Sequence, residues 1–296
     1  MHTHLQILIN DLMEGFPTLP AVVTRVMEIT ADTNSSTKDL YEVIRADQAL
    51  TVNVLKMANS VYYGLPKRIG SLQHALSILG YVEVRNLVIA QAVFNSFKHM
   101  HANGPMDIRP FWTHALTSAM VANRVGHYAG AGHQDFYVAC LVHDIGKLVI
   151  YMALPEAYAE LVKEVGPYAN TMFVMEERFF GMTHEETAQR VLRQWMFPDP
   201  IIQAVGCHHH PERAEAHALF AWVVHVADLL VRWADAAEDA AEPITADLHR
   251  ALLDPVLVRT FSTGSGPWGV ATLDTLKAQL AELKISQANL LALFSS

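Results

Sequence analysis

Apolar side chains recur along most of the chain at the three- and four-residue spacing of an amphipathic helix. In the range 21–31, Val22, Val26 and Ile29 follow this spacing directly after Pro20, and proline favours the start of a helix. The same pattern predicts further helices over 39–46, 50–58, 71–80, 82–97, 111–129, 136–148 and 219–231. We therefore predict an all-α fold.

Breaks in this pattern predict how the helices are grouped. The segment from His99 to Pro110 is polar and contains Gly and Pro, which is typical of a boundary. We expect an N-terminal helical lobe over 1–105, a second helical lobe over 106–235, and a C-terminal helical extension over 236–296. The extension begins with acidic, Ala-rich sequence and ends in a leucine-rich amphipathic helix, which we expect to pack on the domain or on a partner.

Composition narrows the class of protein. The chain has 296 residues, of which 51% are hydrophobic, and a formal charge of −9, so we expect a soluble globular protein that does not bind nucleic-acid duplexes. A charged small-molecule substrate stays compatible with this charge. Two cysteines indicate no disulfide framework, and no signal peptide opens the chain, so we expect the cytoplasm. The apolar run 218–231 is too short to span a membrane.

The most informative polar residues are His143 and Asp144, which interrupt the apolar run 136–148. A buried carboxylate without a partner loses its solvation at a high cost. A divalent metal would compensate for that loss, because neutral imidazole and ionised carboxylate are ordinary metal ligands. The alternative is that Asp144 caps a helix or forms a local salt bridge.

Other polar residues fall on the inward faces of predicted helices. His114 shares a stripe with apolar residues, and Thr183 and Glu186 form a capping box that turns His184 toward the buried side. Any one of these histidines is more often an ordinary core residue, and the triplet 208–210 is often an exposed turn. Their convergence instead predicts one metal centre with two ions, bridged by Asp144. Its expected ligands are His114, His143, Asp144, His184, His208, His209 and Asp228.

The order His, His-Asp, His, His-His, Asp resembles the HD superfamily of metal-dependent phosphohydrolases. A narrower resemblance, to the HDOD family of bacterial signalling output domains, rests on Leu19-Pro20, Asp47 to Leu50, Ala58-Asn59-Ser60, Ile69 to Leu72 and Ala75 to Gly80. It covers roughly residues 15 to 235. It implies an HD-like helical bundle. The family usually has Asp-Pro where this chain has Asp47-Gln48, which should slightly change the start of one helix.

The resemblance implies two functions. HDOD proteins commonly lack part of the ligand set and act as regulatory modules, whereas this chain keeps the set. Relatives that hydrolyse cyclic di-GMP carry Gly-Tyr-Pro after the double His, and this chain has His210-Pro211-Glu212-Arg213 there. That reaction is therefore disfavoured.

The first hypothesis, which we favour from the sequence, is a signal-transduction module that binds a signalling partner through the N-terminal lobe. Its metal site would be structural or sensory. The second is a metal-dependent phosphohydrolase acting on a nucleotide or other small phosphate ester, with Asp144 and Lys147 as catalytic residues. Lys147 would contact a phosphate, unless it is merely a solvated helix end. Mixed imidazole and carboxylate ligation suits iron, manganese, zinc or nickel. An open site beside a pocket with cationic groups would favour the second hypothesis.

Overall fold

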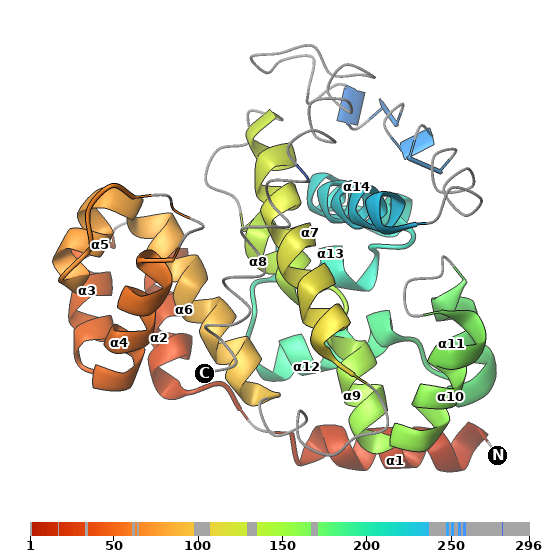
Figure 1. The fold of residues 1–296 in the computed structure, drawn as a ribbon. Helices are drawn as coiled ribbons and strands as arrows, with labels where there is room; N and C mark the ends of the chain where they lie inside the picture. Colours follow the sequence, from red (N-terminus) through yellow and green to blue (C-terminus); the bar gives the residue numbers. More distant parts are fainter. Residues whose placement is uncertain are drawn as a thin grey trace. The chain divides into compact units, whose positions relative to one another are not determined.

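The computed structural model describes residues 2–16, 18–32, 35–60, 63, 65–97, 107–128, 135–166 and 171–236, together with positions 247, 248, 250, 251, 254, 255, 257, 258 and 280. This part of the chain is helical and contains no strand, as Figure 1 shows. The all-α fold predicted from the sequence is confirmed. Most of the predicted C-terminal extension lies outside the described residues, as does the predicted lobe boundary near residue 105.

The described residues divide into two compact units. The larger unit takes residues 1–16 and the described residues of 100–284, and the smaller unit takes the described residues of 17–99. The larger unit therefore includes α1, His2–Glu14, although this helix comes first in the chain. The sequence pattern did not single out this helix.

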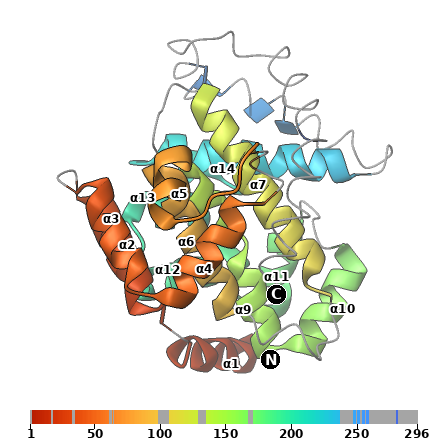
Figure 2. The same cartoon turned by 60° about the vertical axis from the view of Figure 1, so that its left-hand side comes forward.

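The described residues of the smaller unit form five helices, which can be followed in Figure 2. They are α2 (Ala21–Ala31), α3 (Thr37–Arg45), α4 (Gln48–Ala58), α5 (Leu72–Leu79) and α6 (Tyr81–Ser96). Side-chain oxygens cap three of their N-termini: Ser36 caps α3, Asp47 caps α4 and Ser71 caps α5. Each cap satisfies a backbone N–H that has no partner within its helix. Helix α4 thus begins at Gln48, directly after its cap Asp47.

Hydrogen bonds from the Asn59 side chain hold the segment between α4 and α5 in place. Its Oδ1 accepts the backbone N–H of Ile69 at 2.7 Å, and its Nδ2 donates to the carbonyls of Ile69 at 2.8 Å and Leu55 at 2.7 Å. This pairing explains why Asn suits the Ala58-Asn59-Ser60 motif: one side chain supplies both the acceptor and the donor that an extended backbone needs.

The larger unit contains α1 and the remaining helices. They are α7 (Arg109–Tyr128), α8 (Phe136–Val142), α9 (Ile145–Ala153), α10 (Pro155–Val165), α11 (Met172–Phe180), α12 (His184–Gln194), α13 (Asp199–Gly206), the short 3₁₀ helix η3 (Pro211–Arg213) and α14 (Ala218–Asp235). Helix α7 packs against α8 and α14, while α9 packs against α12. The run 136–148, predicted as one helix, is divided at His143 and Asp144, because Asp144 leaves helical geometry with φ −101° and ψ 2°.

Helices α9 and α12 approach each other closely at Gly146. A Cβ atom on Gly146 would lie 2.0 Å from the backbone oxygen of His184 and 2.9 Å from the backbone nitrogen of Ala188. No side chain fits there without separating the helices, so glycine is required by packing. The contact sets Asp144, two residues before Gly146, close to His184.

Among the described residues, one segment is long and apolar enough to cross a membrane. It covers 136–153, and 89% of it is buried inside the protein, as in a core helix. Helices α5 and α6 reach the same length and apolarity only when taken together, and they are bent by 118° at their junction.

Candidate metal centre

The structure brings all seven predicted ligands together inside the larger unit. They come from α7, from the α8–α9 junction, from the first residue of α12, from the segment after α13 and from α14. Three groups have ligand atoms within 4.8 Å of one another: His184, His208 and His209; His114, His143 and Asp228; and His143, Asp144 and His208.

Asp144 lies between the histidines, and its two oxygens face different ones. Oδ1 is 3.4 Å from Nε2 of His184 and 3.6 Å from Nε2 of His208. Oδ2 is 3.4 Å from Nε2 of His143 and 4.0 Å from Nε2 of His114. A carboxylate in this position could contribute one oxygen atom to each of two neighbouring groups of histidine ligands.

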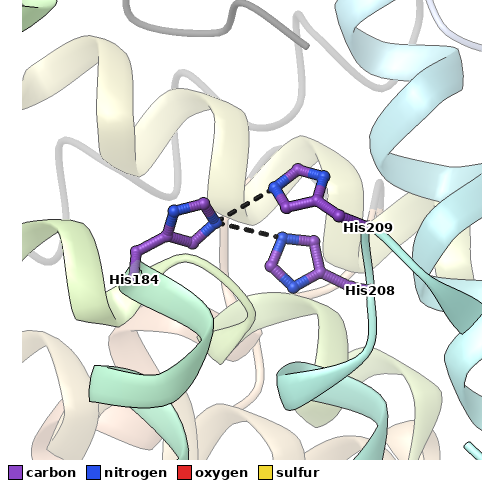
Figure 3. A group of neighbouring side chains, drawn as sticks. All are labelled: His184, His208 and His209. Atoms are coloured by element: carbon purple, nitrogen blue, oxygen red, sulfur yellow. Dashed lines mark hydrogen bonds between the residues drawn. The ribbon is translucent and has the colours of Figure 1, made fainter. Parts of the chain in front are cut away.

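The rings of His184, His208 and His209 turn their Nε2 atoms toward one point, as Figure 3 shows. Nε2 of His184 is 3.4 Å from Nε2 of His208 and 3.1 Å from Nε2 of His209. Imidazole nitrogens this close together could all bind the same metal ion. On the other side of Asp144, Nε2 of His114 lies 3.0 Å from Oδ1 of Asp228.

Backbone carbonyls fix the orientation of two of the rings. Nδ1 of His143 lies 2.6 Å from the carbonyl oxygen of Cys140, and Nδ1 of His208 lies 2.7 Å from that of Val205. A carbonyl only accepts hydrogen bonds, so each Nδ1 carries the proton and donates it. In the neutral ring the Nε2 lone pair is then available to a metal.

Two polar atoms at the centre lack a hydrogen-bond partner among the described residues. They are Nε2 of His143 and Oδ1 of Asp144, and both are fully buried. Most buried polar atoms in proteins are paired. We therefore expect an additional bound group that contacts both the imidazole nitrogen and the carboxylate oxygen. A divalent cation fits both requirements.

The electrostatics of the cluster favour neutral rings for His208 and His209 but a protonated ring for His143, which would release its proton on binding a metal. Burial lowers the pKa of His208 and His209 well below the ordinary value, and neighbouring histidines lower both further. Burial also lowers the pKa of His143, but nearby carboxylates, chiefly that of Asp144, outweigh burial and raise it to about 9. Burial raises the pKa of Asp144, yet His143 and other nearby cationic groups hold it well below its ordinary value. Asp144 is therefore ionised.

Two cations accompany the carboxylates. Nζ of Lys147 lies 2.6 Å from Oδ2 of Asp144, and a guanidinium nitrogen of Arg232 lies 2.5 Å from Oδ2 of Asp228. Both side chains are at least nine-tenths buried. Lys147 is thus not a solvated helix end, and its partner in the structure is Asp144.

Glu176 supports the cluster, and sequence reasoning missed it. This residue of α11 is fully buried, and its Oε2 accepts hydrogen bonds from the backbone N–H and from Nδ1 of His184. Its Oε1 accepts the hydroxyl of Tyr158 at 2.8 Å. A carboxylate behind a ligating histidine orients the ring and raises its basicity. The one signal in the sequence was a carboxylate within a helix rich in Met and Phe.

Sequence reasoning also missed Glu185 and Arg232. Oε1 of Glu185 accepts the backbone N–H of His209 at 3.0 Å and so holds the His208–His209 segment against α12. Arg232 follows Asp228 by one helical turn. That spacing on an otherwise apolar helix was visible in the sequence as a possible ion pair.

A pocket of about 410 Å³ opens beside the cluster. Its walls combine aromatic, imidazole and charged side chains from α11, from the segment after α13, from α14 and from the region beyond it. The lining residues are Phe173, His209, His210, Pro211, Glu212, Trp222, His225, Leu229, Arg232, Asp247, Arg250 and Ala251. His209 belongs to both the pocket and the cluster, so a molecule in the pocket would reach the candidate ligands.

Comparison with known proteins finds one relative by sequence and several solved structures of the same helical fold. An uncharacterized protein of Treponema pallidum is 23% identical over 238 residues, which are 79% of this chain and 45% of that protein. The chain thus spans less than half the length of this relative. An HDOD domain protein of unknown function from Geobacter sulfurreducens has a TM-score of 0.79 at 22% identity, with 97% of this chain and 98% of that chain covered.

Two further solved structures share the fold. One, from Shewanella amazonensis and provisionally named a phosphohydrolase, has a TM-score of 0.72 at 20% identity and covers 98% of both chains. The other, from Marinobacter aquaeolei and provisionally named a signal transduction protein, has a TM-score of 0.71 at 21% identity, with 100% of this chain and 66% of that chain covered.

The family comparison agrees with the resemblance drawn from the sequence. The model of the HDOD domain matches residues 16–211, which include six of the seven candidate ligands and exclude Asp228. This match covers most of the chain. The chain therefore belongs to the HDOD domain family.

Proposed function

We propose that this HDOD protein is a metal-dependent phosphohydrolase that acts on a small phosphate ester. The observation that carries the proposal is the pair of buried, unsatisfied ligand atoms on His143 and Asp144 within a cluster that adjoins a pocket. The pocket includes Arg232 and Arg250. A pocket that contains two arginines and shares His209 with the cluster is the feature that favours hydrolysis over a closed regulatory site.

The seven residues of the cluster would hold two divalent ions. His184, His208 and His209 would form one set of ligands, and His114, His143 and Asp228 the other. Asp144 would serve both sets, because each of its oxygens faces a different pair of histidines. Iron, manganese, zinc and nickel all suit such a set of ligands.

When bound, such ions polarise a phosphoryl oxygen and lower the pKa of a water molecule at the site. The protein's own residues supply the surroundings for that chemistry. Lys147 and Arg232 neutralise part of the carboxylate charge, and Glu176 holds the ring of His184 in place. The pocket would bind the part of the substrate that does not react.

A panel of substrates tests the proposal. The full chain is stripped with a chelator, reloaded with manganese, iron or nickel, and assayed with nucleotides, cyclic nucleotides and an aryl phosphate. We expect metal-dependent turnover that is lost in His143→Ala and in Asp228→Ala. His74→Ala is the control, because His74 is exposed on α5 in the smaller unit. Absence of turnover with every metal would contradict the proposal.

The second candidate is the regulatory module, which binds a signalling partner through the N-terminal lobe. It is supported by the position of the candidate ligands: the family match begins at residue 16, yet the smaller unit contributes none of the seven. A function for that unit other than ligation is therefore needed. Partner binding that survives His143→Ala, without turnover in the wild type, would favour this candidate.

A further inference from the structure

We propose that the pocket beside His209 binds the base of a nucleoside monophosphate, so that the phosphate lies at the metal end. The proposal rests on the proposed function, because it takes the cluster as the place where the phosphate binds. It goes further by assigning the binding of the base to named residues of the pocket. The pocket, in contrast to the cluster, can be tested by binding alone.

The apolar part of the pocket offers flat surfaces. Phe173 on α11 and Trp222 on α14 both line it, together with Leu229. The ring of Phe173 lies parallel to that of His209, with 4.7 Å between ring centroids and 20° between planes. The ring of Trp222 stands edge-on to His225 at 5.6 Å. Aromatic rings held in this way are suitable stacking partners for a planar heterocycle.

The charged part of the pocket is balanced. Two arginines, Arg232 and Arg250, line it together with two carboxylates, Glu212 and Asp247. Arg250 lies 3.1 Å from Asp247, and Glu212 lies 3.2 Å from Nδ1 of His210. This balance does not favour a highly charged polyphosphate. It favours a neutral group that both donates and accepts hydrogen bonds, as a nucleobase does.

The size and position of the pocket support the same class of ligand. A volume of about 410 Å³ lies at the lower end of the range for small-molecule sites, roughly 300 to 1,000 Å³. One wall contains His209 and the buried Arg232, which also contacts Asp228 of the cluster. A phosphate attached to a base in the pocket would therefore point toward the candidate ligands.

Equilibrium binding to the metal-depleted full chain tests the proposal separately from catalysis. Isothermal titration compares four nucleoside monophosphates with ribose 5-phosphate, which has the same sugar and phosphate but no base. We expect at least one nucleotide to bind about 10-fold or more tightly than ribose 5-phosphate, as stacking on an aromatic ring implies. Trp222→Leu and Phe173→Leu should each reduce this ratio and leave the affinity for ribose 5-phosphate unchanged.

Phe179→Leu serves as the matched control, because Phe179 lies on α11 with Phe173 but is 41% exposed and does not line the pocket. Its nucleotide preference should equal that of the wild type. Equal affinity for ribose 5-phosphate and every nucleotide, or no binding of any of them, would overturn the proposal. So would a preference that persists in both pocket variants. A base preference without turnover would support the pocket and count against hydrolysis.

Discussion

The two units of the molecule use polar side chains in different ways. In the smaller unit, Ser36, Asp47, Asn59 and Ser71 lie at helix ends and pair with nearby backbone groups. In the larger unit, the polar residues lie in the middle of the core and face one another, and Nε2 of His143 and Oδ1 of Asp144 are left without hydrogen bonds from described residues. The side chains at these helix ends are thus paired within the fold, whereas the cluster leaves two potential metal-ligand atoms unpaired.

The largest expected effect comes from the close approach of α9 and α12. Gly146→Ala places a Cβ atom 2.0 Å from the backbone oxygen of His184, so the helices must separate. Overpacking commonly costs about 1–3 kcal/mol, and contact with rigid backbone puts this variant at the upper end or beyond. We expect a reduced free energy of unfolding in urea together with loss of bound metal.

Gly70→Ala is the matched control for that variant, because nothing lies within 4 Å of the Cβ it would add. We expect its free energy of unfolding to change by less than about 1 kcal/mol. Equal stability of the Gly146 and Gly70 variants would show that the packing of α9 on α12 does not position the cluster.

A smaller effect is expected from a substitution at Glu176, which tests metal binding in the larger unit separately from folding. Glu176→Gln keeps the shape of the side chain but removes the charge behind His184. Loss of such a supporting carboxylate weakens metal binding by roughly 10- to 100-fold, and we expect this decrease in a competition assay with a chelating dye. Glu177→Gln, the exposed neighbour, should bind metal as the wild type does. If both variants bind alike, Glu176 does not position His184.

The smallest effect is expected in the smaller unit. Asn59→Ala removes the hydrogen bonds to the backbone of Ile69, which should cost about 1 kcal/mol because Asn59 is largely exposed. Asn59→Asp keeps an acceptor for the Ile69 N–H and should recover part of this loss. Thermal unfolding measures both variants. Loss of bound metal in Asn59→Ala would contradict the claim that the polar residues of the smaller unit serve the fold and not the metal site.

The sequence contained most of the information about the helices and about which residues come together in the cluster. Periodicity predicted α2 with its observed bounds, and the capping box of Thr183 and Glu186 is present. These features are local. The stripe that carries His114 is also buried as expected. The break between α8 and α9 was not predicted, because apolar residues continue on both sides of His143 and Asp144 and the two polar residues could equally lie within one helix.

Features that depend on distant contacts were not predictable. Glu176 is eight residues from His184, and no helical spacing links two residues on different helices. The requirement for glycine at position 146 becomes visible only when α12 crosses α9. The pocket combines residues of α11 and α14 with Asp247, Arg250 and Ala251, so no single stretch of sequence contains its signal.

The most direct test of the account is the metal content of the purified full chain, measured by mass spectrometry beside Asp144→Ala. We expect one to two equivalents of a transition metal in the wild type, because the cluster has ligands for two ions. Asp144→Ala should lose the metal while its circular dichroism stays helical, since the apolar faces of the helices carry most of the burial energy. Less than about a tenth of an equivalent in the wild type, with none regained on reloading, would contradict the metal centre.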